Sequence, residues 1–148
     1  MKSPRDRLID ALAASMNAGP ANEDPIEQAE ARLQLFFPPT YRMFLALYGA
    51  TMGTGFEIHG LSPDTDEEDS PPLWKDVVSS TLKWRPDALP QNSIQISHDG
   101  CEIGYFLECS TTDRDFEGQI IEWGPLHNGA FPTGLNFIEF VEHLKEES

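Results

Sequence analysis

Residues 24–49 read DPIEQAEARLQLFFPPTYRMFLALYG, and they contain the strongest helix signals of the chain. Asp24, Pro25 and Glu27 have the spacing of an N-cap, a proline at the first helical position and a carboxylate at the third, so they predict that a helix begins here. The side of this helix that faces the core would carry Ile26, Ala29, Glu30 and Leu33.

Two prolines, Pro38 and Pro39, end that helix and open another. Gly49 is well placed to end the second helix, because glycine accepts the backbone angles that a helix C-terminus requires. The apolar residues between them recur with helical spacing and are Tyr41, Phe44, Leu45 and Tyr48.

Residues 4–16 predict a further helix on the N-terminal side of this stretch. Ser3 would be its N-cap and Pro4 its first residue. A loop with Gly19 and Pro20 would separate it from the next helix. Its apolar stripe comprises Leu8, Ile9, Leu12, Ala13 and Met16.

The apolar pattern changes from helical to extended after Gly49. Residues 56–61 predict a strand, and residues 62–72 predict a loop in which five of the six positions from Asp64 to Asp69 are acidic. A helix is then predicted over residues 74–84, with an apolar stripe of Trp74, Val77, Val78, Thr81 and Trp84.

Asp99 and Gly100 stand between two alternating runs and predict a β-hairpin, because both accept the positive φ angles of a two-residue type I′ turn. The expected cross-strand pairs are His98 with Cys101, Ile96 with Ile103, and Ile94 with Tyr105. The expected core face carries Ile94, Ile96, Ile103, Tyr105, Leu107 and Cys109.

The opposite face of this hairpin bears on function. A third strand over residues 118–124 would place Ile120 on the same side as Phe106, which makes both of them apolar anchors among carboxylates. This arrangement is typical of protein recognition, in which anchors hold the complex and an acidic rim steers a basic partner. The alternative is that the N-terminal helix or a loop covers this face.

Asn136 and Glu139 have the spacing of a capping box and predict a last helix, whose buried stripe is Phe137, Ile138, Val141 and Leu144. Helices, then mostly sequential strands, then one helix indicate an α+β fold. We expect an antiparallel sheet of about four or more strands, covered on one face by the N-terminal and C-terminal helices. The length of 148 residues fits a single domain over residues 1–148, with a core at about 24–145 and the helix at 4–16 as an addition.

The charge of the chain excludes several classes of partner. It has 25 Asp and Glu against 10 Lys and Arg, a formal net charge of -15. Residues 1–85 hold 13 acids and 8 bases, a net of -5, and residues 86–148 hold 12 acids and 2 bases, a net of -10. Nucleic acids and anionic membranes need a surplus of Lys and Arg, so neither is expected to bind. A basic protein is the favoured partner.

The candidate partner-binding residues form two groups. One is the acidic loop, for which the alternative is a solvated loop without contacts. The other is the outer face of the sheet. The candidates are Asp64, Asp66, Glu67, Glu68 and Asp69 in the loop, and Glu102, Phe106, Glu108, Ile120 and Glu122 on the sheet.

No motif indicates catalysis, a cofactor or a metal, and none is expected. Ser97, His98 and Asp99 have the residue types of a catalytic triad, but neighbours on a strand point to opposite faces and cannot make the required contacts. His98 and Cys101 alone do not make a metal site. No signal peptide or membrane-spanning run is visible, so a cytoplasmic location is expected.

Residues 26–33, residues 37–45 and Gly49 together resemble the signature of the SMI1/KNR4 (SUKH) superfamily. This signature is an acidic helix that ends in Leu, a Leu-Pro-x-x-Tyr turn, a Phe-Leu helix and a glycine. The hairpin at Asp99-Gly100, the strand at 118–123 and the helix at 136–141 agree with it. The resemblance covers about residues 24–145. It departs from the family pattern at Phe37, where Leu is common, and in the longer acidic segment at 64–84.

The resemblance implies a non-catalytic α+β binding domain. Bacterial members of the superfamily resemble immunity proteins that neutralise toxins of contact-dependent and polymorphic toxin systems, many of them nucleases. Fungal members act as regulatory interaction proteins. We therefore expect an immunity protein that binds a cognate, basic toxin. The alternative is a regulatory or scaffolding module that binds a host protein, and the oligomeric state stays open.

Overall fold

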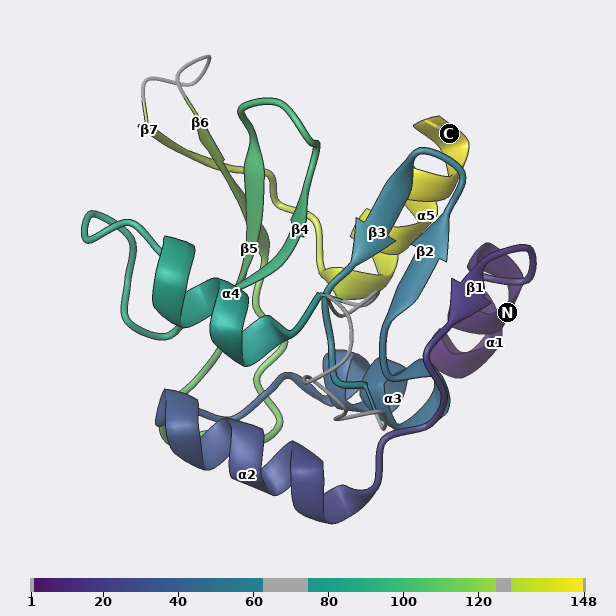
Figure 1. Cartoon of the computed structure of the whole chain (residues 1–148), viewed down its shortest axis with the longest axis horizontal. Helices are drawn as coiled ribbons and strands as arrows, with labels where there is room; N and C mark the ends of the chain where they lie inside the picture. Colours follow the sequence, from purple (N-terminus) through teal and green to yellow (C-terminus); the bar gives the residue numbers. More distant parts are fainter. Residues whose placement is uncertain (1, 63–74, 125–128, 148) are drawn as a thin grey trace, which may run out of the picture.

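The structure is a computed structural model that describes residues 2–62, 75–124 and 129–147 (Figure 1). It has the expected α+β architecture. The helices are α1 Pro4–Ala11, α2 Glu23–Leu33, α3 Pro39–Tyr48, α4 Val77–Trp84 and α5 Phe137–Glu147. The strands are β1 Met16–Asn17, β2 Thr51–Gly53, β3 Phe56–Ile58, β4 Ser93–His98, β5 Gly104–Glu108, β6 Ile120–Gly124 and β7 Gly129–Pro132.

The strands form two antiparallel sheets, one with the order β4-β5-β6-β7 and one with the order β1-β2-β3. The main hydrophobic core lies against one face of the four-stranded sheet and includes residues of α1, α2, α3 and α5. A smaller cluster of Leu89, Phe106 and Ile121 lies on the other face. α4 packs against β4, and Figure 1 shows it beside β4 and β5. Both faces of the sheet are therefore partly covered.

The α2–α3 region supplies the centre of the main core. Tyr41 is fully buried, and its ring centroid lies 5.2 Å from that of Phe37, 5.8 Å from that of Phe44 and 5.2 Å from that of Phe137 in α5. Its hydroxyl donates a hydrogen bond of 2.7 Å to the carbonyl of His59. Burial raises the pKa of this hydroxyl well above its ordinary value, so it stays protonated and donates. The predicted apolar stripe of α3 is confirmed.

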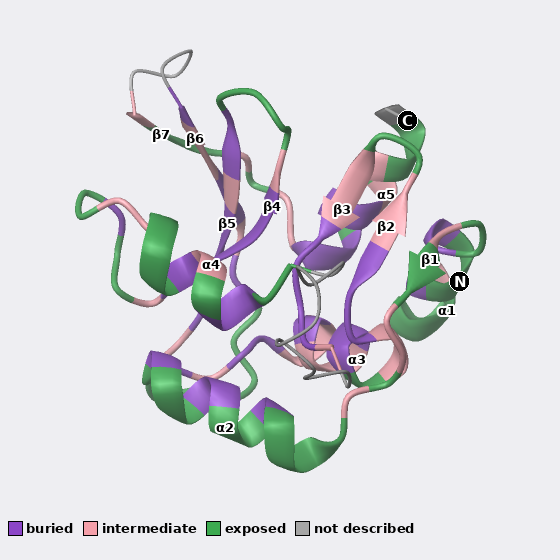
Figure 2. Ribbon diagram, in the orientation of Figure 1, coloured by how far each residue is buried: buried purple, intermediate pink, exposed green. Residues whose placement is uncertain are grey.

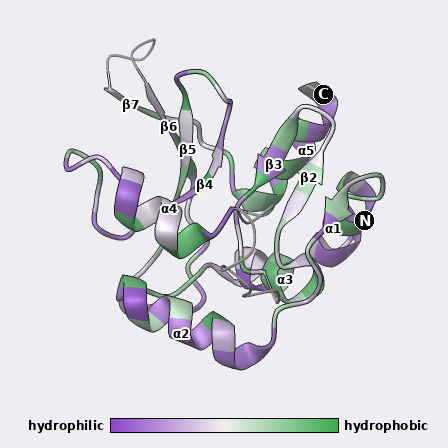
Figure 3. Cartoon of the chain, in the orientation of Figure 1, coloured by the Kyte–Doolittle hydropathy of each residue, from purple (hydrophilic) through white to green (hydrophobic). Residues whose placement is uncertain are grey.

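Glu30 is a buried carboxylate whose hydrogen bonds tie α2 to α3. It accepts a hydrogen bond of 2.7 Å from the amide of Phe37, and its oxygens lie 3.2 and 2.9 Å from Nε and Nη2 of Arg42. Glu30 raises the pKa of the Arg42 guanidinium. This pairing explains how a charged residue can occupy the buried stripe of α2. Figure 2 shows the exposed residues of α2 on its outer side, and Figure 3 shows hydrophilic and hydrophobic residues alternating along it.

Gly49 ends α3, as predicted, and no other residue type fits there. Its φ is +72°, and its amide donates to the carbonyl of Leu45 at 3.0 Å. A Cβ at this position would collide with the carbonyl oxygens of Gly19 and Leu61. The segments at Gly19 and Leu61 can therefore pack closely against the end of α3, because Gly49 has no Cβ.

The first two helix boundaries differ from the prediction. α1 ends at Ala11 instead of residue 16, because Met16 belongs to β1 and pairs with Met52 of β2. α2 begins at Glu23, with Asn22 as N-cap in place of Asp24. A proline is tolerated throughout the first turn, since the amide that it lacks would have no partner within the helix, so Pro25 did not mark the first residue.

The β4–β5 hairpin is present, but its predicted register is wrong. Ile94 lies opposite Leu107, whereas the prediction placed it opposite Tyr105. An irregularity between Gln95 and Ser97 shifts the register again. The core face is nevertheless largely as expected, because a shift of two residues leaves side chains on the same face of a strand.

The loop of this hairpin is longer than a two-residue turn, so His98 and Cys101 do not pair. Oδ1 of Asp99 accepts hydrogen bonds from the amides of Cys101, Glu102 and Ile103 at 2.8, 3.0 and 3.0 Å. This carboxylate satisfies three backbone donors at once and stabilises an open loop over residues 99–103.

The remaining elements agree more closely with the predictions from the sequence. Asn136 and Glu139 form the predicted capping box at the start of α5, with reciprocal hydrogen bonds of 3.0 and 2.9 Å. The strand expected at 56–61 is shorter and ends at Ile58. The third strand of the hairpin sheet begins at Ile120 instead of residue 118. β2 and β7 were not predicted.

Candidate partner-binding site

α4 lies beside β4, the edge strand of the four-stranded sheet, and one buried hydroxyl joins the two elements. Asp76 caps the helix, since its Oδ1 accepts a hydrogen bond of 2.8 Å from the amide of Ser79. Thr81 is fully buried, and its Oγ1 accepts a hydrogen bond of 2.9 Å from the amide of Gln95 in β4. The outer edge of β4 is thereby partly covered, which protects it from pairing with another strand.

A pocket of about 460 Å³ lies between α4, the end of β3 and the β4–β5 hairpin. This volume is typical of sites that bind a small molecule or a side chain. Gly104 keeps the pocket open, because a Cβ there would lie 3.1 Å from the ring of Phe106 and 3.3 Å from Nε2 of Gln95. Its aromatic and charged lining residues are Trp84, Phe106, Trp123, Glu57, Lys75 and Glu102.

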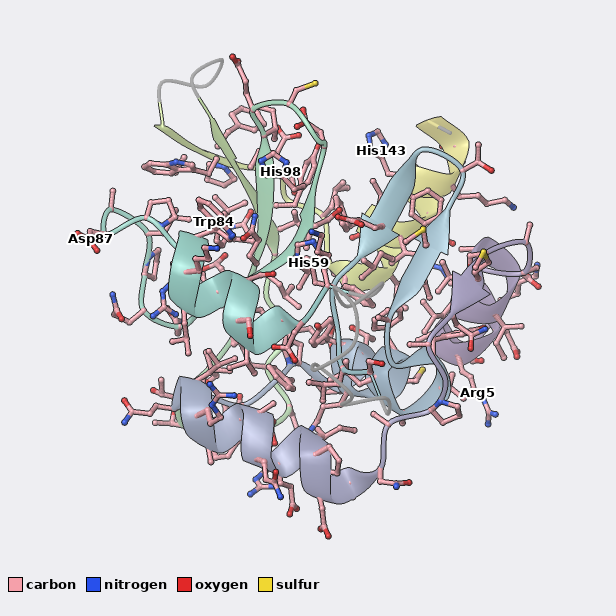
Figure 4. All side chains as sticks on the ribbon, in the orientation of Figure 1. Arg5, His59, Trp84, Asp87, His98 and His143 are labelled. Carbon is pink, nitrogen blue, oxygen red and sulfur yellow. The ribbon has the colours of Figure 1, made fainter. Side chains whose placement is uncertain are left out.

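Two buried side chains that line this pocket carry polar atoms without hydrogen-bond partners among the described residues. Gln95 and His59 are each 4% exposed. Oε1 of Gln95 and both ring nitrogens of His59 make no hydrogen bond within the described part of the chain. Buried polar atoms are nearly always paired, so three such atoms at one pocket are unusual. Figure 4 shows His59, Trp84 and His98 in the region between α4 and the hairpin.

The electrostatics of the pocket favour a neutral His59. Burial lowers the pKa of its imidazole, while the nearby Glu57 acts in the opposite direction, and the pKa lies below its ordinary value. The Oε1 atom of Glu57 lies 3.6 Å from Nε2 of His59. A neutral imidazole has one nitrogen that accepts a hydrogen bond and one that donates.

The hairpin loop forms one rim of the pocket. Nδ1 of His98 accepts a hydrogen bond of 2.9 Å from the amide of Gly100. Burial acts to raise the pKa of Asp99, but the amide hydrogen bonds from Cys101 and Ile103 outweigh it, and the pKa lies below its ordinary value. Asp99 is therefore an anion that shapes the loop, and Glu102 is presented from it in an exposed position.

The predicted surface on the sheet is only partly assembled, because Phe106 and Ile120 lie on opposite faces. Phe106 is opposite Ile121, and Leu107 is opposite Ile120, so the assumed alignment of the third strand was wrong by one residue. Ile120 is fully buried in the main core, and Phe106 is 2% exposed in the smaller cluster. Neither side chain is an exposed anchor, and Leu89 packs with Phe106 and Ile121 on the face that was expected to be open.

The other predicted partner-binding residues are scattered. Glu102 lines the pocket together with Phe106. Glu108 lies opposite Ser93 at the other end of β5, and Glu122 pairs with Tyr105. The acidic cluster of Asp64, Asp66, Glu67, Glu68 and Asp69 lies outside the described residues, so its role stays a prediction.

Sequence reasoning missed most of the pocket. Trp84, Gln95 and Trp123 come from three separate elements and His59 directly follows β3, and no sequence spacing connects them. Trp84 was assigned to the apolar stripe of its helix, but it is 62% exposed at the end of α4. An aromatic residue at a helix end, where the next turn no longer covers it, was the one available signal.

The triad residue types at Ser97, His98 and Asp99 are used for local structure. The Ser97 hydroxyl donates a hydrogen bond of 2.6 Å to the carbonyl of Glu57, not to His98. Within residues 2–62, 75–124 and 129–147, no group of three His, Cys, Asp or Glu side chains is arranged to hold a metal ion. In the same part of the chain, no helix is both long and apolar enough to cross a membrane.

Comparison with known proteins gives one clear result. Residues 6–146 match the SUKH_5 family model, which is described as SMI1-KNR4 cell-wall. The match covers nearly the whole chain and includes most of α1, which lay outside the resemblance seen in the sequence. A search among curated proteins gives no match.

Proposed function

We propose a function from one premise, which is that the chain belongs to the SMI1-KNR4 (SUKH) family. The chain is a non-catalytic protein-binding domain. Its specific role is that of an immunity protein, which binds a cognate toxin of a polymorphic or contact-dependent toxin system in the cytoplasm and blocks its active site or substrate groove. The observation that carries this proposal is the family match over residues 6–146.

The charge of the chain supports a nuclease-type toxin as the partner. A nuclease must present a basic groove to hold nucleic acid. The net charge of -15, of which -10 lies in residues 86–148, would attract such a groove. Attraction between opposite charges speeds encounter and makes association sensitive to salt. The proposed mechanism is therefore competition with nucleic acid for the basic surface of the toxin.

Two acidic surfaces are the proposed contacts. One is the rim of the pocket, where Glu57 and Glu102 lie among aromatic side chains. The other is the acidic loop at 64–69. Glu30 and Glu142 are less suited to this role, because they are engaged with Arg42 and Arg7 of the same chain.

We also propose that residues 1–148 act as one domain that includes α1. Leu8 of α1 is fully buried in the main core, and Arg7 pairs with Glu142 of α5 at 2.5 Å. Limited proteolysis should accordingly leave α1 attached. Rapid loss of α1 with the remainder intact would contradict this organisation.

Co-expression tests the immunity role. The product of the reading frame next to this gene is expressed in a host with and without this chain, and growth is measured. Immunity predicts that the neighbour inhibits growth and that co-expression restores it. Failure to restore growth would contradict immunity and favour the regulatory or scaffolding role.

The electrostatic part is tested separately by association kinetics at several salt concentrations. Glu102→Lys and a charge-reversed 66–69 cluster should each slow association and weaken its salt dependence. Glu146→Lys, on the exposed end of α5, changes the net charge as much as Glu102→Lys and is its matched control. If the control and both test variants associate at the same rate, neither proposed surface steers the partner.

A further inference from the structure

We propose that the pocket beside α4 receives the guanidinium group of an arginine side chain from the protein partner. This inference rests on the proposed protein-binding function and names the contact that it uses. It is argued from the unpaired acceptors inside the pocket, from its aromatic walls and from the charges at its rim.

The polar atoms inside the pocket require hydrogen-bond donors. Oε1 of Gln95 is an acceptor only, and it accepts no hydrogen bond within the described residues. The neutral imidazole of His59 offers one further acceptor nitrogen. Guanidinium carries five N–H donors in a planar fork and has no acceptor, so it can satisfy acceptors that lie on different elements at once.

The walls and the rim suit a planar cation. Trp84, Phe106 and Trp123 line the pocket, and arginine stacks on aromatic faces. Nζ of Lys83 lies 5.1 Å from the centroid of the Trp84 ring, so this ring already takes part in a cation–π contact within the chain. Glu57 and Glu102 supply carboxylates, with which guanidinium forms charge-assisted hydrogen bonds.

Other classes of occupant fit less well. An anion would face Glu57 and Glu102, with Lys75 as the single Lys or Arg among the described lining residues. An apolar side chain would bury Gln95 and His59 without satisfying them. A lysine ammonium has the correct charge but only three donors, and it does not stack as a plane.

The test uses the full chain and the probe N-acetyl-argininamide. Two other probes are matched to it: N-acetyl-citrullinamide, which is nearly the same shape without the charge, and N-acetyl-lysinamide. Binding is followed by NMR through the indole N–H signals of Trp84 and Trp123 and the side-chain amide of Gln95. We expect saturable shifts with argininamide at about millimolar concentration, binding about fivefold weaker with lysinamide, and no saturation with citrullinamide.

Two variants locate the binding. Glu102→Gln changes an exposed residue, so the fold should be kept, and we expect affinity to fall about fivefold. Gln95→Leu removes the buried acceptor and should weaken binding further. Glu146→Gln has the same charge change as Glu102→Gln and should bind as the wild type does. The proposal is overturned if argininamide gives no saturable shifts at about 50 mM, if citrullinamide binds equally well, or if Glu102→Gln and Glu146→Gln bind alike.

This result is independent of the growth test, because the probe experiment contains no toxin. Argininamide binding without growth rescue supports the pocket and contradicts immunity. Growth rescue without argininamide binding supports immunity and overturns the pocket.

Discussion

The α2–α3 region and the pocket beside α4 differ in the hydrogen bonding of their buried polar groups. In the α2–α3 region, the carboxylate of Glu30 takes hydrogen bonds from Phe37 and Arg42. In the pocket, Gln95 and His59 contain polar atoms with no hydrogen-bond partner among the described residues. His59 belongs to both, since its carbonyl accepts from Tyr41 while its imidazole lines the pocket. The buried carboxylate of the first region has its hydrogen-bond partners within the chain, whereas the pocket has polar atoms that a bound partner could pair.

Gly49→Ala in the α2–α3 region should have the largest effect. The new Cβ would meet two carbonyl oxygens and adopt a φ of +72°, so we expect a loss of about 4 kcal/mol in the free energy of unfolding. Urea denaturation measures it. Gly55→Ala is the control, because its φ is +81° but nothing lies within 4 Å of its Cβ position, and we expect a loss of about 1 kcal/mol. Equal losses would mean that steric contact at Gly49 is unimportant.

Glu30→Ala should come next. It leaves the buried amide of Phe37 and the guanidinium of Arg42 without their acceptor, and we expect a loss of about 3 kcal/mol in the free energy of unfolding. The control is Glu142→Ala, which breaks the more exposed pair with Arg7 and should cost about 0–1 kcal/mol. Similar losses of stability would mean that the buried hydrogen bonds of Glu30 contribute no more than the exposed ion pair of Glu142.

The pH dependence of stability should reveal the unsatisfied imidazole of His59. Its pKa is lowered in the folded chain, so below about pH 6.5 the unfolded chain binds the proton more strongly. Stability is therefore fully present above that pH and falls as the pH decreases, by at most about 1.4 kcal/mol per pH unit for one proton. Asp99 and Glu142, whose pKa values are also lowered, contribute only near pH 4 and below.

His59→Gln should reduce this dependence between about pH 7 and pH 5, as measured by urea denaturation at each pH. His143→Gln, which removes an exposed histidine of α5, is the control. If both substitutions change the pH dependence of stability to the same extent, burial in the pocket does not lower the pKa of His59 as proposed.

Trp84→Ala should have the smallest effect on stability. The side chain is 62% exposed, so the free energy of unfolding should stay within about 0.5 kcal/mol of the wild-type value, while N-acetyl-argininamide binding weakens. Phe44→Ala, at a fully buried aromatic position, should instead cost about 3–5 kcal/mol. A large loss of stability in Trp84→Ala would show that this side chain stabilises the fold, as a core residue does, and would contradict its assignment to a binding pocket.

The predictability of the two regions differs for a physical reason. Helices α3 and α5 were predicted well, because their caps and apolar stripes are made by residues within one or two turns of each other. Gly49 and the reciprocal bonds of Asn136 and Glu139 are examples. The family signature lies in these same residues, so it identified the fold. It did not identify a binding surface, because most of the signature side chains are buried.

The β structure depends on residues far apart in the sequence. Met16 continues a helical stripe in the sequence but pairs with Met52 in the structure. The hairpin register depends on Asp99, whose side chain replaces a tight turn. One residue of misalignment moved Ile120 from the core to the predicted surface, because neighbouring residues of a strand face opposite sides.

The acidity of the chain, the α+β class, the main helices and the resemblance to a family could all be predicted from the sequence, because each of these follows from composition or from short-range spacing. The covered faces of the sheet and the position of the pocket became evident in the folded chain alone. His59, Trp84, Gln95 and Trp123 are brought together by the packing of α4 and the register of four strands. Packing and register are properties of the whole fold, so no local pattern encodes them.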